Sequence, residues 1–223
     1  AQNHTLVFAN NFTAENASIG QGTLLFEFGS WNRDNNTFAE DSSITNVTLT
    51  IDSTNNTLTG LRDTINDSSM GVTASIIQTA ESAYSLVVKS NSGSGNEMKI
   101  TATEDASNTG LSTFGFSTYS SSKETIIGKD ANITVDGVSV SRSSNIITDL
   151  IDGVQLELKG TVSSATTVEA SYDEATALAN MNSFVEALNT LNTKIAELTN
   201  RGLNGENAGA LAGDSVTLSL IHI

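Results

Sequence analysis

Apolar and polar residues alternate along the first 28 residues of the chain, which is the pattern of β-strands with one buried face. The pattern predicts two strands that are joined by a polar loop. The second strand places three apolar side chains on one face: Leu24, Phe26 and Phe28. Ser30–Ser43 is then predicted to be a polar loop, and it contains the only tryptophan, Trp31. A tryptophan on such a loop is expected either to anchor a partner or to pack in the core.

The segment Thr48–Ala74 predicts a strand, a turn, a short helix and a second strand. The first strand carries apolar residues at every second position: Val47, Leu49 and Ile51. Asp52–Asn56 consists of residues that favour turns. The helix is predicted from three apolar residues at helical spacing, Leu58, Leu61 and Ile65. Gly71 ends the helix, and strand spacing resumes with Val72, Ala74 and Ile76.

Two further strands follow, and the glycine turn Gly93–Gly95 joins them. Their apolar residues are Tyr84, Leu86 and Val88 on the first strand and Met98, Ile100 and Ala102 on the second. Gly110–Phe116 is predicted to form a short helical turn, and Ser117–Glu124 is predicted to be a loop or linker.

Asp136 and Gly137 separate two alternating segments, which is a strong short-range signal for a β-hairpin. The facing apolar residues are Ile133 and Val135 on one strand and Val138 and Val140 on the other. Ser143 or Ser144 is expected to cap a short helix. Its apolar residues are Ile146, Ile147, Leu150 and Ile151. A second Asp-Gly turn leads into a strand with Val154, Leu156 and Leu158, and one more strand is predicted from Val168, Ala170 and Tyr172.

Asp173–Asn200 has helical spacing and is rich in helix-forming residues. Its apolar stripe consists of Leu178, Met181, Val185, Leu188, Leu191, Ile195 and Leu198. Asn192 occupies a heptad core position, Arg201 is expected in a basic last turn, and Gly202 is expected at the C′ position. The helix would be about 40 Å long, which is more than small β-modules need. We therefore expect the stripe to form a bundle or subunit contact, and the alternative is packing within this chain.

Composition limits the partners that the chain can have. Its 223 residues are enough to bury a sizeable core, and its formal net charge is −15. Such a surface repels nucleic-acid phosphates and anionic membranes, so neither is expected as a partner. The chain has no cysteine, which excludes disulfides and thiolate metal sites. No apolar run has the length of a membrane span, and the start does not resemble a signal peptide.

No combination of residues suggests catalysis, a cofactor or a metal site. The two histidines, His4 and His222, lie at opposite ends of the chain, and Ser120–Ser122 has no neighbouring base. Asp63 and Asp67 lie four residues apart on the predicted short helix, but the spacing of a calcium-binding loop is missing. We interpret these two carboxylates as part of a solvated face. The chain is therefore not expected to be an enzyme.

Several segments, taken in order, resemble the flagellar filament cap family, which is also called the flagellar hook-associated protein 2 family. Leu58–Asn66, LTGLRDTIN, is close to the wording of a module that recurs among flagellar axial proteins. The other matching segments are AQNHTL (1–6), GQGTLLF (20–26), GVTASII (71–77), YSLVVKSNSGSGNEMKI (84–100), VDGVSVSRSSNIITDLIDGVQLELKG (135–160), FVEALNTLNTKIAELT (184–199) and GALAGDS (209–215). The family's terminal coiled-coil segments are absent, so we interpret the chain as a central fragment.

The resemblance implies an α+β fold, with two small β-rich domains, one inserted in the other, and a long helix from a helical-bundle domain. Residues 1–26 together with 133–170 would form the β-rich second domain. Residues 27–132 would form the inserted third domain, which contains the short helix. Residues 171–223 would be part of the helical first domain.

The resemblance also implies a structural assembly protein without a cofactor. It would cap the bacterial flagellar filament, retain exported flagellin and promote its folding and incorporation at the tip. Its partners would be flagellin, hook-associated proteins and further copies in a ring, while the fragment alone is expected to be monomeric. It would be extracellular, exported without a cleaved signal peptide and not inserted in a membrane. Two alternatives stay open: an adhesin-type module for mucin or host glycans, and another axial protein such as a flagellin.

Overall fold

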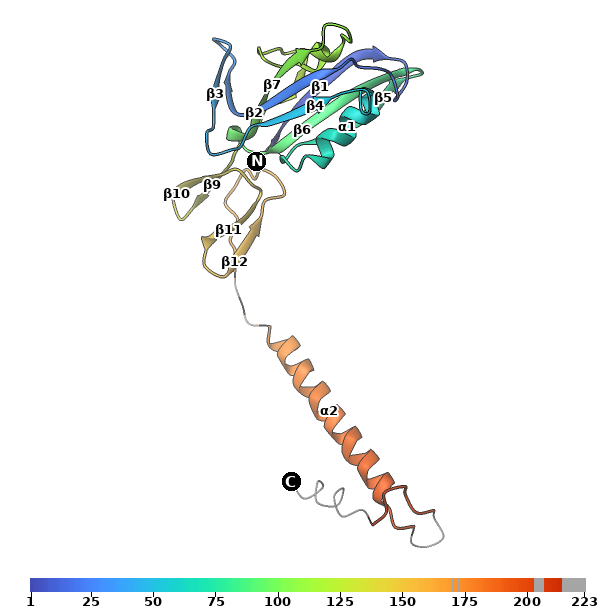
Figure 1. The fold of residues 1–223 in the computed structure, drawn as a ribbon. Coiled ribbons are helices and arrows are strands. Elements are labelled where there is room, and N and C mark those ends of the chain that lie inside the picture. Colours follow the sequence, from blue (N-terminus) through green and yellow to red (C-terminus); the bar gives the residue numbers. More distant parts are fainter. Residues whose placement is uncertain (170, 172, 203–206, 214–223) are drawn as a thin grey trace. The chain divides into compact units, whose positions relative to one another are not determined.

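The computed structural model describes residues 1–169, 171, 173–202 and 207–213, without the side chains of Asn10 and Asn11. The chain divides into two compact units, Ala1–Thr161 and Val162–Ile223. Each unit is described by itself (Figure 1).

The first unit is built around two four-stranded antiparallel sheets. One sheet has the order β5-β6-β1-β8, and its strands are β1 (Asn3–Phe12), β5 (Thr73–Ala80), β6 (Ala83–Ser92) and β8 (Glu124–Ile126). The other sheet is centred on β2 (Gly22–Asn32) and also contains β3 (Thr37–Glu40), β4 (Val47–Ile51) and β7 (Glu97–Glu104). β3 and β4 pair with successive parts of one edge of β2, and β7 pairs with the opposite edge. We call β1 to β8, together with the helix α1, the β-body.

A single hydrophobic core joins both sheets with α1 (Leu58–Asp67). Leu58, Leu61 and Ile65 are the buried face of this helix, as predicted from their spacing. The hydroxyl of Thr57 caps the helix by accepting a hydrogen bond from the Gly60 N–H at 3.0 Å. The alternating residues predicted for β2, β4, β6 and β7 supply much of the remaining core: Leu24, Phe26, Phe28, Leu49, Ile51, Leu86, Val88, Met98 and Ile100.

Trp31 does not lie on a polar loop, so this prediction is wrong. The strand β2 continues to Asn32, and Trp31 is paired with Phe38 on β3. Only 6% of Trp31 is exposed, and its ring packs against those of Phe38 and Phe116, with centroids 5.0 and 5.4 Å away. Of the two alternatives for this residue, the structure selects core packing.

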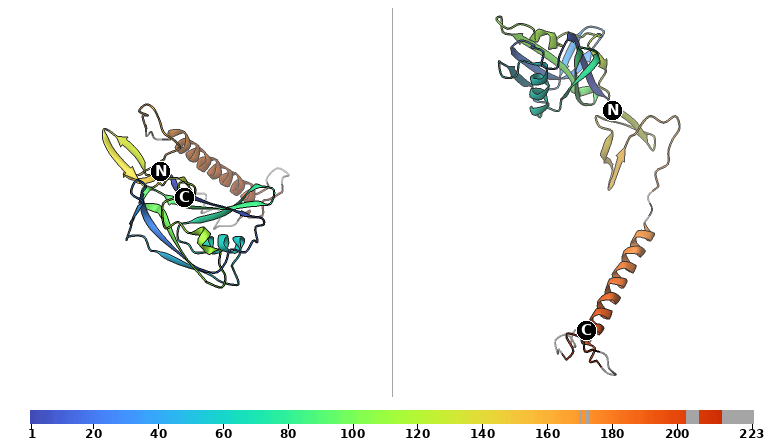
Figure 2. Two further views of the ribbon diagram at one scale, coloured as in Figure 1. Left: turned by 90° about the horizontal axis from the view of Figure 1, so that it is seen from above. Right: turned by 90° about the vertical axis from the view of Figure 1, so that its right-hand side faces the viewer.

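Two short hairpins follow the β-body, and the start of the chain lies beside them (Figures 1 and 2). The first hairpin, β9 (Ala131–Val135) with β10 (Val138–Arg142), has the predicted facing residues. Asp136 and Gly137 have φ of 49° and 85°, which is the left-handed pair of a type I′ turn. Before the hairpins, the short helical turn that was predicted for Gly110–Phe116 is present as η2 (Leu111–Phe114). We call β9, β10 and the following two strands the hairpin pair.

The short helix predicted after Ser144 is wrong, because this segment is strand β11 (Ile146–Ile151). β11 pairs with β12 (Val154–Glu157), and Ile151 faces Val154 across the second Asp-Gly turn. The Ser144 hydroxyl accepts a hydrogen bond from the N–H of Ile146 at 3.0 Å, but it does so at the start of a strand.

The strand pairing is continuous across Phe26, the predicted domain boundary. β2 runs through this residue and pairs with β7 from Gly22 to Gly29. β1 likewise pairs with β6, so the first 26 residues belong to the sheets of the predicted insertion. Residues 27–132 by themselves contain neither β1 nor the first part of β2.

The second unit contains the helix α2 (Glu174–Thr199), which confirms the predicted long helix. Its N-cap is Asp173, which accepts a hydrogen bond from the Thr176 N–H at 2.9 Å. The helix has no basic residue in its last turn, and Asn200 is its C-cap, so Arg201 and Gly202 lie beyond the places predicted for them. Of the predicted strand before α2, Val168 is in no strand, and Ala170 and Tyr172 lie outside the described residues.

Residues 207–213 return to the end of α2. The N–H groups of Gly209 and Leu211 donate to the carbonyls of Asn200 and Leu198, at 2.8 and 2.9 Å. A Cβ on Gly209 would lie 2.1 Å from the Leu198 oxygen, so this approach requires glycine. The last carbonyls of the helix are thus satisfied by a returning segment.

Candidate interaction surfaces

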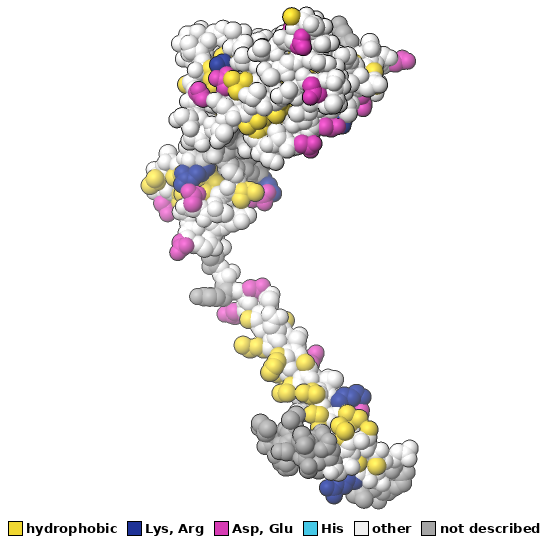
Figure 3. Space-filling view, in the orientation of Figure 1, with side chains coloured by type: hydrophobic (Ala, Val, Ile, Leu, Met, Phe, Trp, Pro, Cys, Tyr) yellow, Lys and Arg dark blue, Asp and Glu magenta, His cyan; other side chains and the backbone are white. Residues whose placement is uncertain are grey.

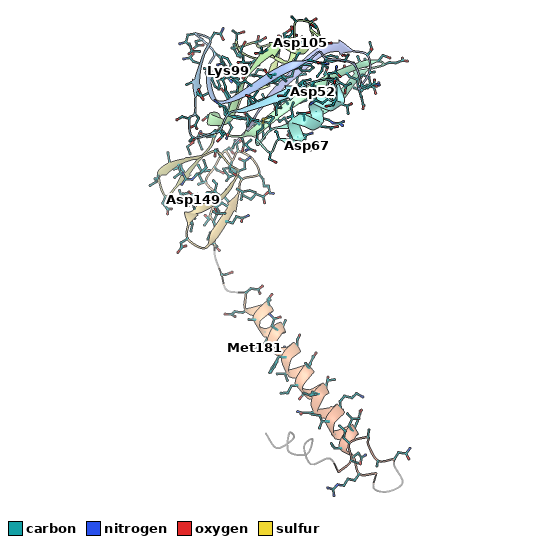
Figure 4. All side chains as sticks on the ribbon, viewed as in Figure 1. Asp52, Asp67, Lys99, Asp105, Asp149 and Met181 are labelled. Atoms are coloured by element: carbon teal, nitrogen blue, oxygen red, sulfur yellow. The ribbon has the colours of Figure 1, made fainter. Side chains whose placement is uncertain are left out.

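The predicted apolar stripe lies along α2, and its side chains gather on one side of the helix (Figure 3). Met181, labelled in Figure 4, projects from this side and is 67% exposed. Five further members are between 40% and 60% exposed: Leu178, Val185, Leu188, Leu191 and Leu198. Ile195 is the partly covered member of the stripe. Exposed apolar patches are typical of interaction sites, so this row of side chains is a candidate contact surface.

Phe184 belongs to the same surface, although it is not among the residues predicted for the stripe. It is 70% exposed and lies seven residues before Leu191, which lies seven before Leu198. These three residues form a third column beside the two columns of the heptad core. Two columns are typical of a two-stranded coiled-coil seam, whereas a wider face is typical of a helix in a bundle.

On the opposite face of α2, polar side chains form hydrogen bonds and ion pairs with other groups of the same helix. The hydroxyls of Thr190 and Thr193 donate to the carbonyls of Glu186 and Asn189, at 2.8 and 2.9 Å. Lys194 forms an ion pair with Glu197 at 2.7 Å. This face therefore needs no partner, and the apolar face is the one that gains by being covered.

A buried ionic cluster in the β-body consists of His4, Arg33, Glu97 and Glu124. Arg33 Nη2 lies 2.5 Å from Glu97 Oε1 and 2.5 Å from Glu124 Oε1, and Arg33 Nε donates to Glu124 Oε2 at 2.9 Å. The two glutamate side chains are only 2% and 3% exposed. Hydrogen bonds to Glu124 raise the pKa of Arg33, so it stays charged and compensates the carboxylates.

His4 is fully buried and bonded at both ring nitrogens. Nδ1 accepts the N–H of Met98 at 2.9 Å, and Nε2 lies 2.9 Å from Glu124 Oε1. Because Nδ1 is an acceptor, the neutral ring carries its proton on Nε2 and donates it to Glu124. Burial lowers the pKa of His4, although Glu97 and Glu124 act in the opposite direction. Burial alone would raise the pKa of Glu124, but Arg33 and His4 outweigh this effect and lower it.

The remaining candidates that the structure describes show no arrangement for chemistry, and His222 lies outside the described residues. A shallow cleft of about 580 Å³ lies at the β2–β3 turn beside Arg33, whose guanidinium is already bound to two carboxylates. Asp63 pairs with its neighbour Arg62 at 2.7 Å, and Asp67 is exposed. Among the residues that the structure describes, no three His, Cys, Asp or Glu side chains are placed to hold a metal ion. Within the same residues, no helix has the length and apolarity to cross a membrane.

Comparison with known proteins assigns the chain to a family. Residues 128–222 match the family model described as the flagellar hook-associated protein 2 C-terminus. The B-type flagellar hook-associated protein 2 of Pseudomonas aeruginosa PAO1 is 35% identical over an alignment of 192 positions, which covers 78% of this chain and 40% of that protein. The crystal structure of FliD (HAP2) from the same strain has a TM-score of 0.57 at 30% identity, over 86% of this chain and 84% of the other. The chain belongs to the flagellar hook-associated protein 2 (FliD) family.

Two other FliD structures match different shares of the chain. The D1-D2-D3 domains of the flagellar cap protein FliD from Escherichia coli match 99% of it and 58% of their own length, with a TM-score of 0.68 and 26% identity. The D2-D3 domains from Serratia marcescens match 74% of it and 84% of their own length, with a TM-score of 0.57 and 25% identity. The fold class predicted from the sequence, α+β with a long helix after β-rich parts, is that of FliD. The chain spans about 40% of the length of the B-type flagellar hook-associated protein 2 of Pseudomonas aeruginosa.

Proposed function

We propose that this chain is the central part of a protein that caps the bacterial flagellar filament at its outer end. In this role it retains exported flagellin and promotes the folding and incorporation of flagellin at the tip. The observation that carries the proposal is the match over 99% of the chain to a flagellar cap protein. These similarities do not favour the adhesin-type or flagellin alternatives.

We further propose that α2 belongs to the D1 domain and that the β-body and hairpin pair belong to D2 and D3. The structure that includes D1 matches 99% of the chain, and the one without D1 matches 74%. The difference corresponds to about the share of the chain that the second unit occupies.

The apolar face of α2 is the surface through which we expect assembly. Its three columns suit a helical bundle, whose other helices come from the rest of the full-length protein or from a neighbouring copy. The chain by itself has only one long helix among its described residues, and we expect it to be monomeric in solution. Flagellin, other hook-associated proteins and further copies in a ring are the proposed partners of the complete protein.

The test uses the full-length protein in a motile strain that lacks its own copy. Leu188→Asp places a charge in the middle of the apolar face, where burial of an unpaired charge is strongly unfavourable. We expect flagellin to appear in the medium, filaments to be lost and motility to fail, while the purified variant keeps the β-sheet signal of the wild type.

Asn192→Asp is the matched control, because it introduces the same charge on the same helix at an already polar position. It is expected to retain motility. Normal filaments and motility with Leu188→Asp would contradict an assembly role for this face. If the gene is deleted and filament growth is unaffected, the cap function itself is wrong.

A further inference from the structure

His4 joins three strands of the β-body that are far apart in the sequence. It lies on β1, accepts a hydrogen bond from the backbone of β7 at Met98, and donates one to the Glu124 side chain on β8. The donor at Met98 is a backbone N–H, which cannot reverse its role. The ring can therefore make both bonds only while Nδ1 carries no proton.

We propose that His4 is an acid-sensitive clasp that holds the edge strand β8, and with it the start of the hairpin pair, on the β-body. When the ring takes up a second proton, Nδ1 becomes a donor that points at another donor, and the bond to Met98 is lost. The proton comes from solvent and no other group changes, so the step is a simple protonation that couples to local opening.

β8 depends on this clasp because its other attachments are few. The strand has three residues, and its register with β1 shifts between the two pairs Thr5–Ile126 and Leu6–Glu124. The Glu124 side chain is 3% exposed, and its carboxylate is bonded to His4 and Arg33. Protonation breaks the bond from Met98, whereas Nε2 donates to Glu124 in both forms of the ring. The Glu124 bond is lost only on opening, together with the Arg33 bonds, the two pairs with β1 and the bond from the Thr125 hydroxyl to the Thr5 carbonyl at 3.2 Å.

The chain passes directly from β8 into the junction with the hairpin pair. Gln2, two residues before His4, exchanges backbone hydrogen bonds with Lys129 at 2.7 and 3.1 Å, and its carbonyl also accepts from Gly93 at 3.1 Å. Asp130 accepts bonds from the N–H and hydroxyl of Ser94 at 2.8 and 2.9 Å. Gln2 lies just before β1, which carries His4, and Lys129 lies just after β8. Opening at β8 is therefore expected to loosen this junction.

The charges around the ring determine the direction of the effect. Glu97 and Glu124 favour the protonated ring, whereas burial and the nearby guanidinium of Arg33 oppose it, and burial is the largest of these influences. The pKa of His4 in the clasped state is thus lowered. In the opened state the ring regains an ordinary pKa of about 6.5.

The sign and size of the effect follow from linkage. The opened state binds the proton more tightly, so acid favours opening and the stability of the clasp is present above about pH 6.5. Between pH 7.5 and pH 5.5 the opened population is expected to rise, by at most about tenfold. Glutamate has an ordinary pKa near 4.3, well below the range from pH 5.5 to 7.5. A change of the opened population within this range is therefore due to histidine.

Amide hydrogen exchange of the full 223-residue chain tests the proposal. Protection factors, corrected for the intrinsic effect of pH on exchange, are measured at pH 7.5 and 5.5. We expect those of residues 124–130 and of Met98 to fall, by at most about tenfold, while those of α1 stay constant.

Two single-residue variants serve as controls. His4→Gln keeps one donor and one acceptor on a side chain that does not titrate, and it should remove the pH effect. His222→Gln changes the only other histidine and should leave the effect as in the wild type. An unchanged protection of 124–130 in the wild type, or a pH effect that persists in His4→Gln, would overturn the proposal.

A second readout does not depend on any variant folding. Nitrogen chemical shifts of the His4 ring at pH 7.5 should show a protonated Nε2 and an unprotonated Nδ1. The opposite tautomer, or a ring that is doubly protonated at this pH, would rule out the clasp even if His4→Gln fails to fold.

Discussion

The indole Nε1 of Trp31 donates a hydrogen bond to the carbonyl oxygen of Met98 at 2.9 Å. Met98 also donates its N–H to His4, so the two backbone groups of this residue are used by two buried rings. Both side chains are enclosed in the core, since His4 is fully buried and only 6% of Trp31 is exposed. The strand β7 is therefore fixed by side chains from both sheets of the β-body.

Replacing Trp31 by phenylalanine is expected to lower the free energy of unfolding by about 1–3 kcal/mol or more. The variant leaves the Met98 carbonyl without its buried partner and removes part of a packed ring. Urea unfolding, followed by circular dichroism, measures the change. Tyr84→Phe removes a hydroxyl from a half-buried ring and is expected to change the stability by less than about 0.5 kcal/mol. Equal effects of the two variants would show that the Trp31 bond does not contribute.

Arg33→Met is expected to destabilise the β-body by about 3–5 kcal/mol, because it leaves Glu97 and Glu124 buried without a compensating charge. Arg142→Met is the comparison, since it removes the same kind of side chain from an exposed pair with Asp149 on β11 (Figure 4). Exposed pairs contribute at most about 1 kcal/mol. Thermal unfolding at neutral pH distinguishes the two, and a similar loss in both would contradict the role of the buried cluster.

Gly29→Ala and Gly137→Ala compare two reasons for glycine with the same change of one methyl group. A Cβ on Gly29 would lie 2.0 Å from the backbone oxygen of Ala39, so β3 must move. A Cβ on Gly137 meets nothing within 4 Å, and the cost there is the left-handed φ alone, about 1–2 kcal/mol. We expect Gly29→Ala to lower the melting temperature more than Gly137→Ala, and the reverse order would show that β3 is easily displaced.

Brief digestion with trypsin is expected to cut first after Lys159. This side chain is 77% exposed and precedes a stretch without regular structure that leads to the second unit. The fragment 1–159 should keep a cooperative thermal transition, because it contains both sheets and the shared core. Early cleavage after Lys99 or Lys123, which lie within the β-body, would contradict this division of the chain.

The elements whose signal is local were predictable from the sequence. The α1 helix, the two Asp-Gly turns and the long helix α2 each depend on residues within a few positions of one another. The segment after Ser144 was ambiguous for the same reason: its isoleucines at 146, 147 and 151 fit one face of a helix as well as a strand. Pairing with β12 decides between the two, and this pairing is not visible in a short window of sequence.

The buried ionic cluster had no local signal at all. His4 and Glu124 are separated by 120 positions, and Arg33 and Glu97 by 64. His4 and Glu124 meet because β1 pairs with β8, and Arg33 and Glu97 meet because β2 pairs with β7. No single segment specifies either pairing. The apolar face of α2 was predictable from its heptad spacing, but the third column with Phe184 required attention to the neighbouring positions.

The 120-position separation between His4 and Glu124 has a consequence for the order of folding. Contacts between near neighbours, as in the two hairpins with two-residue turns and in α2, form in microseconds or less. A contact that closes so long a loop forms later, since the chain must lose more conformational entropy before the contact stabilises it. We therefore expect β8 to join its sheet in one of the last steps of folding. The bond from His4 to Glu124 would then form only when the β-body is complete.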